Sequence, residues 1–76
     1  MEFERLAKLI AEVMNLDRGE IRPESDLEED LGADSLDVFQ IIIDVEDELQ
    51  IEIPAEDAVK VRTVKDILEL ADKARC

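Results

Sequence analysis

The side chains that could do chemistry are few, and they narrow the possible functions. The 76 residues contain no histidine, which removes the most common general base and the most common nitrogen ligand for metal ions. The single cysteine, Cys76, cannot form an internal disulfide, and we expect it to be an exposed terminal residue. No base, nucleophile and orienting group can be assembled from the rest. We therefore expect no catalytic activity and no metal site in the chain itself.

Ser35 is distinguished by the residues around it. It follows Asp34 at the point where a long polar loop meets a predicted helix. Asp34 is a favourable N-cap, and Asp37 lies where a capping box would place its acidic member. If Asp34 caps the helix, the Ser35 hydroxyl falls at the first helical position and stays free and exposed. Composition alone favours the simpler interpretation, which is an ordinary serine at a helix start.

The elements that position Ser35 can be predicted from the spacing of apolar residues. A first helix is expected over residues 2–15, with an apolar stripe of Phe3, Leu6, Ile10, Val13 and Met14. The loop that follows, residues 16–34, is long for a compact domain, so we expect it to be functional or held down by its own side chains. Its candidate anchors are Ile21, Leu27 and Leu31.

The second half of the chain predicts three further helices. One runs from Ser35 to about Leu49, and one short turn or helix covers residues 55–60 after Pro54. Thr63 caps the last helix, whose apolar face comprises Val64, Ile67, Leu68, Ala71 and Ala74. No hairpin signal is present. We expect an all-α fold, a small four-helix bundle of three longer helices and one short helix, forming a single monomeric domain over residues 1–76.

The predicted helix at residues 35–49 is apolar on two faces. Its core face comprises Val38, Ile41, Ile42, Val45 and Leu49. A second stripe on the opposite side consists of Leu36, Phe39 and Ile43, and acidic residues border it. One interpretation is an exposed docking strip for another protein. The other is that the long loop or the short helix covers this strip, and partial cover is compatible with both.

The charge of the chain limits its partners. The net charge is −13, and residues 23–59 contain no Lys or Arg while holding 14 of the 22 acids. Nucleic acid and anionic membrane surfaces would be repelled, so neither is an expected partner. The acids either attract a basic patch on another protein or only keep the chain soluble.

The sequence also predicts where the protein acts. No apolar run approaches the roughly 20 residues of a membrane span, and the first residues lack the basic and then apolar order of a signal peptide. We therefore expect a cytoplasmic protein.

The segment Leu-Gly-Ala-Asp-Ser-Leu-Asp at residues 31–37 resembles the signature of acyl carrier proteins. The Asp-Ser-Leu tripeptide alone is weak, because it occurs often by chance. The resemblance, however, extends along the whole chain: the first helix, the acidic loop, the acidic second helix, the Ile-Pro at 53–54 and the Thr-Val at 63–64. The expected fold is therefore the carrier bundle.

This resemblance implies a function for each position of the motif. Ser35 would receive 4'-phosphopantetheine from coenzyme A through a phosphopantetheinyl transferase, and the thiol of that arm would hold acyl groups as thioesters. Asp34 would assist the transferase by contacting its metal. Partners would be acyl-loading, condensing and modifying enzymes with basic docking patches. The residues expected to bind them are Leu36, Asp37, Phe39, Ile43, Asp44, Asp47 and Glu48.

The resemblance is compatible with two kinds of pathway. Fatty-acid synthesis is the first expectation, and a specialised carrier for a polyketide, modified-lipid or aminoacyl pathway is the alternative. Two positions depart from the pattern of housekeeping fatty-acid carriers, which commonly have Glu where this chain has Gln40 and an aliphatic residue where it has Phe39. These departures either mark a specialised carrier or are sequence drift.

Functions of two other classes are alternatives to a carrier. The first is an unmodified helical interaction module in which Ser35 is only structural. The second is a calcium-binding protein, suggested by the many acids. Residues 26–37 lack the alternating ligands, central Gly and terminal Glu of an EF-hand loop, so a specific calcium site is not expected.

Overall fold

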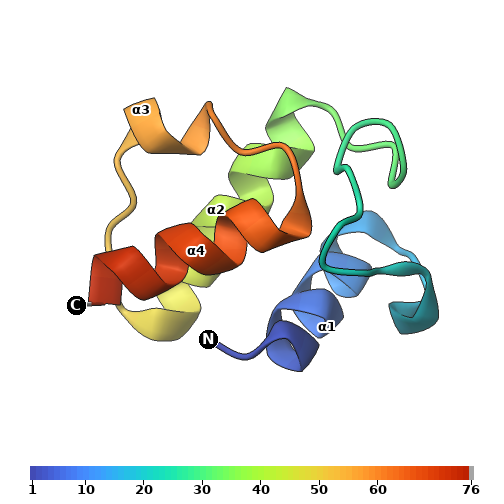
Figure 1. The fold of residues 1–76 in the computed structure, drawn as a ribbon, viewed down its shortest axis with the longest axis horizontal. Helices are drawn as coiled ribbons and strands as arrows, with labels where there is room; N and C mark the ends of the chain where they lie inside the picture. The colour runs from blue at the N-terminus through green and yellow to red at the C-terminus, as the bar shows by residue number, and fades with distance from the viewer. Residues whose placement is uncertain (76) are drawn as a thin grey trace.

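The computed structural model describes residues 1–75, and within this range it is helical, as expected (Figure 1). The expectation for Cys76 lies outside the described residues. The elements are α1 (Phe3–Met14), a 3₁₀ turn η1 (Arg18–Glu20), α2 (Ser35–Leu49), α3 (Ala55–Ala58) and α4 (Val64–Arg75). The prediction of three longer helices and one short helix is therefore confirmed. The turn η1, inside the long loop, was not predicted.

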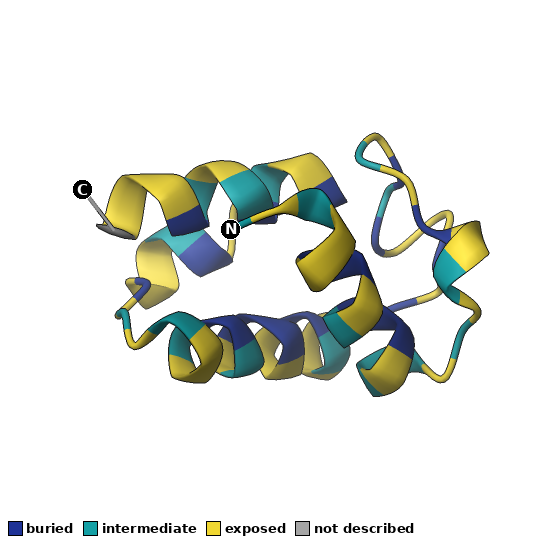
Figure 2. Cartoon of the chain, turned by 90° about the horizontal axis from the view of Figure 1, so that it is seen from below, coloured by how far each residue is buried: buried dark blue, intermediate teal, exposed yellow. Residues whose placement is uncertain are grey.

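The three longer helices pack on one another around the core. Figure 2 shows that their buried residues lie on the sides that face one another, while the outer sides are exposed. On α1 the buried residues are Leu6, Ala7, Ile10 and Ala11, and on α2 they are Val38, Ile41, Ile42 and Val45. Burial of each large apolar side chain contributes about 1.5–3 kcal/mol, so these faces hold the bundle together.

The helix α4 follows its predicted apolar face except at its end. Val64, Ile67 and Ala71 are buried and Leu68 is half-buried. Ala74 is exposed, so its placement in the apolar face was wrong. Ala74 falls one turn past Ala71, beyond the part of α4 that the other helices cover, and helical spacing alone does not show where that cover ends.

The long loop is pinned to the start of α4 by backbone hydrogen bonds. The Leu27 N–H donates to the Arg62 carbonyl, just before α4, at 2.8 Å. Within the loop, the Ala33 N–H donates to the Leu27 carbonyl at 2.8 Å. The predicted anchors Ile21, Leu27 and Leu31 are all buried. Gly32 has a φ of +75°, a left-handed conformation that favours glycine and lets the loop turn into α2. These contacts fix the position of the residue that precedes Ser35.

Candidate functional site

The junction between the loop and α2 is built by a reciprocal cap. Asp34 has extended backbone angles, and its Oδ1 accepts a hydrogen bond from the Asp37 N–H at 2.9 Å. In return, the Asp37 Oδ2 accepts one from the Asp34 N–H at 3.3 Å. This is the predicted capping box. Because Asp34 satisfies the helix terminus, Ser35 is the first helical residue and its side chain is not needed for capping.

The Ser35 side chain is free at the surface. The residue is exposed, and its hydroxyl makes no hydrogen bond to any group within residues 1–75. It lies at the positive end of the α2 dipole, where an anion is tolerated best, by about 0.3–1 kcal/mol at an exposed position. The hydroxyl can therefore accept a phosphate ester without disturbing the fold.

A small cleft lies beside the Ser35 side chain, and five of its seven lining residues are apolar. It has a volume of about 110 Å³. Its lining residues come from the loop, from α2, and from α3 with the segment after it: Glu28, Ser35, Val38, Phe39, Ala58, Val59 and Val61. The cleft therefore offers apolar contacts next to the Ser35 hydroxyl.

The second apolar stripe of α2 remains exposed. Leu36 is 78% exposed, Ile43 is 54% exposed and Phe39 is 38% exposed. The lower exposure of Phe39 arises because it also lines the cleft beside Ser35. The loop and α3 therefore cover this stripe only in part. We call Leu36, Phe39 and Ile43 the apolar strip.

Val59 was missed by the sequence reasoning. It lies directly after α3, is 68% exposed and lines the same cleft as Ser35 and Phe39. No sequence signal separated it from the neighbouring apolar residues, because four helical residues are too few for a hydrophobic period to define a face.

The predicted docking acids of α2 differ in what they contact. The Asp47 carboxylate has no hydrogen-bond or ion-pair partner within the described part of the chain. Asp44 accepts a hydrogen bond from the Gln40 side-chain amide at 2.9 Å through one oxygen. The Glu48 carboxylate accepts hydrogen bonds from the Arg5 guanidinium, whose Nε lies 3.0 Å from the Glu48 Oε1. Charge and spacing predicted these acids, but the contact between Arg5 and Glu48 joins two helices and could not be read from either one.

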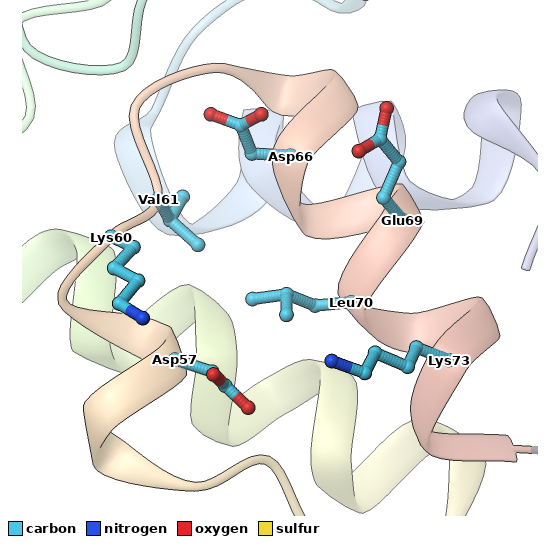
Figure 3. A pocket seen from close by; sticks show the side chains of 7 residues that line it. All are labelled: Asp57, Lys60, Val61, Asp66, Glu69, Leu70 and Lys73. Atoms are coloured by element: carbon cyan, nitrogen blue, oxygen red, sulfur yellow. The ribbon is translucent and has the colours of Figure 1, made fainter.

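A groove elsewhere on the surface is larger than the cleft beside Ser35 and is not lined by Ser35. It has a volume of about 270 Å³ and lies between α3 and α4. Figure 3 shows Lys60 and Lys73 extending toward Asp57 and Leu70 inside it. Its lining mixes cationic and anionic side chains, so it selects no ligand class by charge. Because Ser35 is not among its lining residues, the groove is separate from the site at Ser35.

One carboxyl group has a shifted pKa, and the cause is structural. Partial burial raises the pKa of Asp66, but hydrogen bonds from the Arg62 and Thr63 backbone and the Thr63 hydroxyl outweigh it and hold the pKa below its usual value. The Asp66 Oδ2 accepts the Thr63 N–H at 3.0 Å, while the Asp66 N–H donates to the Thr63 Oγ1 at 3.2 Å. Thr63 is the predicted cap of α4, and the Asp66 carboxylate completes it from the third helical position and has no part in the Ser35 site.

Comparison with known proteins places this arrangement in a family. The family model described as a phosphopantetheine attachment site matches residues 4–71. The acyl carrier protein of Helicobacter hepaticus is 44% identical over 66 residues, which cover 87% of this chain and 87% of that protein. A solved structure assigned as an acyl carrier protein from Mycobacterium tuberculosis superposes with a TM-score of 0.87 at 36% identity, covering 95% of this chain and 97% of the other.

The chain belongs to the phosphopantetheine-dependent acyl carrier family. Its cofactor is 4'-phosphopantetheine, which is covalently attached and supplies a thiol on a long flexible arm. The residues present fit this group, because an unbonded exposed hydroxyl stands at a helix N-terminus beside an apolar cleft. Within residues 1–75 no helix is both long and apolar enough to cross a bilayer.

Proposed function

We propose that Ser35 is the attachment site and that the protein carries acyl groups as thioesters on its arm. The observation that carries this proposal is the Ser35 hydroxyl, which is exposed and unbonded because Asp34 and Asp37 cap the helix in its place. In the transfer, a bond forms between Ser35 Oγ and the phosphorus nearest the pantetheine of coenzyme A. The phosphoanhydride bond breaks, adenosine 3',5'-bisphosphate leaves, and the hydroxyl proton passes to the transferase or to solvent.

Asp34 has a second role in this proposal. Its Oδ1 is used by the Asp37 N–H, whereas its other oxygen has no hydrogen-bond partner within the described residues. That oxygen is available to the metal ion held by the transferase. Asp34 would then orient Ser35 through the cap and also help hold the transferase in register.

The test is the intact mass after incubation with coenzyme A and a broad-specificity phosphopantetheinyl transferase. The parent chain should gain one phosphopantetheine, and Ser35→Ala should gain none. Ser25→Ala is the matched serine control and should be loaded like the parent, because Ser25 is buried and its Oγ accepts the Arg22 N–H. Loading of Ser35→Ala would refute the site. No loading of the parent, beside an active control carrier, would favour an unmodified interaction module.

We place the carrier in fatty-acid synthesis, with delivery to acyl-loading, condensing and modifying enzymes in the cytoplasm and no catalysis by the chain itself. The acids of α2 and the apolar strip would form the surface that these enzymes bind. The residues assigned to it are Leu36, Asp37, Phe39, Ile43, Asp44, Asp47 and Glu48.

A specialised pathway is the second candidate, and two observations favour it. Gln40 replaces a charge on α2 with an amide that bonds Asp44, and Phe39 places an aromatic ring at the Ser35 cleft. The two candidates separate when the loaded carrier is offered to the malonyl-transfer and condensing enzymes of fatty-acid synthesis. Elongation at the rate of a housekeeping carrier supports fatty-acid synthesis. A carrier that is loaded but not elongated supports the specialised pathway, provided that Gln40→Glu restores elongation.

A further inference from the structure

A cation of the chain itself occupies part of the docking surface. Arg5 extends from α1 to Glu48, near the end of α2, and both its Nε and its Nη2 donate to the same carboxylate oxygen. The two side chains are 56% and 44% exposed, so this pair is at the surface and is not part of the core. The pair therefore forms where an approaching protein could also reach Glu48.

Glu48 lies on the same flank of α2 as Asp37 and Asp44, because helical positions separated by four, seven and eleven residues share a face. A partner with basic side chains along this whole flank would also contact Glu48, which is the acid nearest to the end of α2. Arg5 already makes that contact and brings the local charge of the pair to zero. By contrast, the Asp47 carboxylate, beside the apolar strip, is not engaged by any described residue.

We propose that Arg5 is an internal competitor for the basic group of a partner enzyme at Glu48. The proposal rests on the carrier function above, since it concerns the same docking surface. The partner is an enzyme with an apolar recess for Leu36 and Phe39 and with basic side chains that extend along α2 to Glu48. An enzyme whose basic patch continues to Glu48 must displace Arg5 first, and a surface ion pair of this kind is weak enough to be displaced.

The test uses the transferase as the partner and compares two substitutions on α1 at low ionic strength. Arg5→Gln should raise kcat/KM for loading by roughly 1.5- to 5-fold, the range of an exposed ion pair. Lys8→Gln is the matched control, because Lys8 is an exposed α1 residue without an ion pair in residues 1–75 and its loss changes the net charge equally. It should raise kcat/KM distinctly less.

The effect must also depend on Glu48. In a Glu48→Gln background, Arg5→Gln should have no more effect than Lys8→Gln. An effect that persists there, or equal effects of Arg5→Gln and Lys8→Gln in the parent chain, would overturn the proposal. Loss of loading in the parent itself would instead count against the carrier function.

A second readout does not depend on loading. The protein is titrated with a hexa-arginine peptide while the Glu48 side-chain carboxyl resonance is followed by NMR. Arg5→Gln should lower the peptide concentration at which the Glu48 resonance reaches half of its full shift. Lys8→Gln should leave that concentration close to the value of the parent. An unchanged response in Arg5→Gln would overturn the proposal even if no transferase loads the chain.

Discussion

The two faces of α2 carry the same kinds of apolar residue but differ in how far these residues are buried. On the inner face, Ile41 and Val45 are both fully buried. On the outer face, Ile43 is 54% exposed and Leu36 is 78% exposed. The inner face gains its stability from contact with α1 and α4. The outer face is covered only in part, and its exposed apolar residues form the surface that we propose a partner binds.

The largest expected effect separates the two faces by stability. Ile41→Ala should lower the free energy of unfolding by about 2–5 kcal/mol, because it leaves a cavity in the core. Ile43→Ala is the matched change on the outer face and should cost about 0.5 kcal/mol or less. Urea unfolding followed by circular dichroism measures both. Similar losses for the two variants would mean that the outer face is also part of the core.

The next effect separates the faces by function. Leu36→Ala should lower kcat/KM for loading by about tenfold, which corresponds to about 1.4 kcal/mol of lost contact with the transferase. Its free energy of unfolding should stay close to that of the parent, because Leu36 is exposed. A fall in stability without a fall in loading rate would reverse the roles assigned to the two faces.

A smaller effect tests the Asp66 carboxylate, which completes the cap of α4. Folding lowers the pKa of Asp66, so its contribution is complete above the unfolded pKa of about 3.9 and is lost as the pH falls through the folded pKa. Asp66→Asn should therefore cost about 0.3–1 kcal/mol near neutral pH. The difference from the parent should shrink in acid. Urea unfolding from pH 7 downward checks this, and a difference that grew in acid would contradict the cause given for the shift.

The smallest expected effect concerns a single docking charge. Asp47→Asn should lower kcat/KM for loading by roughly 1.5- to 5-fold at low salt and by less at high salt, because salt screens exposed charges. Glu12→Gln removes the same charge from the exposed side of α1 and serves as the control. Equal effects of the two variants at every salt concentration would show that only the net charge matters, and not a contact at Asp47.

Local signals in the sequence predicted much of the fold and the centre of the site. Asp34 and Thr63 are caps as expected, because capping depends on residues only three positions apart. The loop anchors were also predicted, since few apolar residues were available in that loop. The short turn η1 was overlooked, although Asp17 and Glu20 have capping-box spacing and the Asp17 N–H donates to the Glu20 carboxylate at 3.0 Å.

The features that could not be predicted depend on contacts between distant segments. The exposure of Ala74 depends on where the other helices stop covering α4, and the exposure of Val59 depends on how α3 is set against α2. The Arg5–Glu48 pair joins residues 43 positions apart. Helical spacing defines a face, but it does not say which groups of another helix that face will meet.

The most direct test of the central claim is to locate the modification on the loaded chain. Trypsin should release residues 19–60 as one peptide, because it cleaves after Arg18 and Lys60, and Arg22, the single Lys or Arg between them, is followed by Pro23. That peptide contains both serines of the chain, Ser25 and Ser35. Fragmentation should place the phosphopantetheine on Ser35, with the fragments that hold only Ser25 unmodified. Phosphopantetheine on Ser25, or on neither serine, would contradict the account.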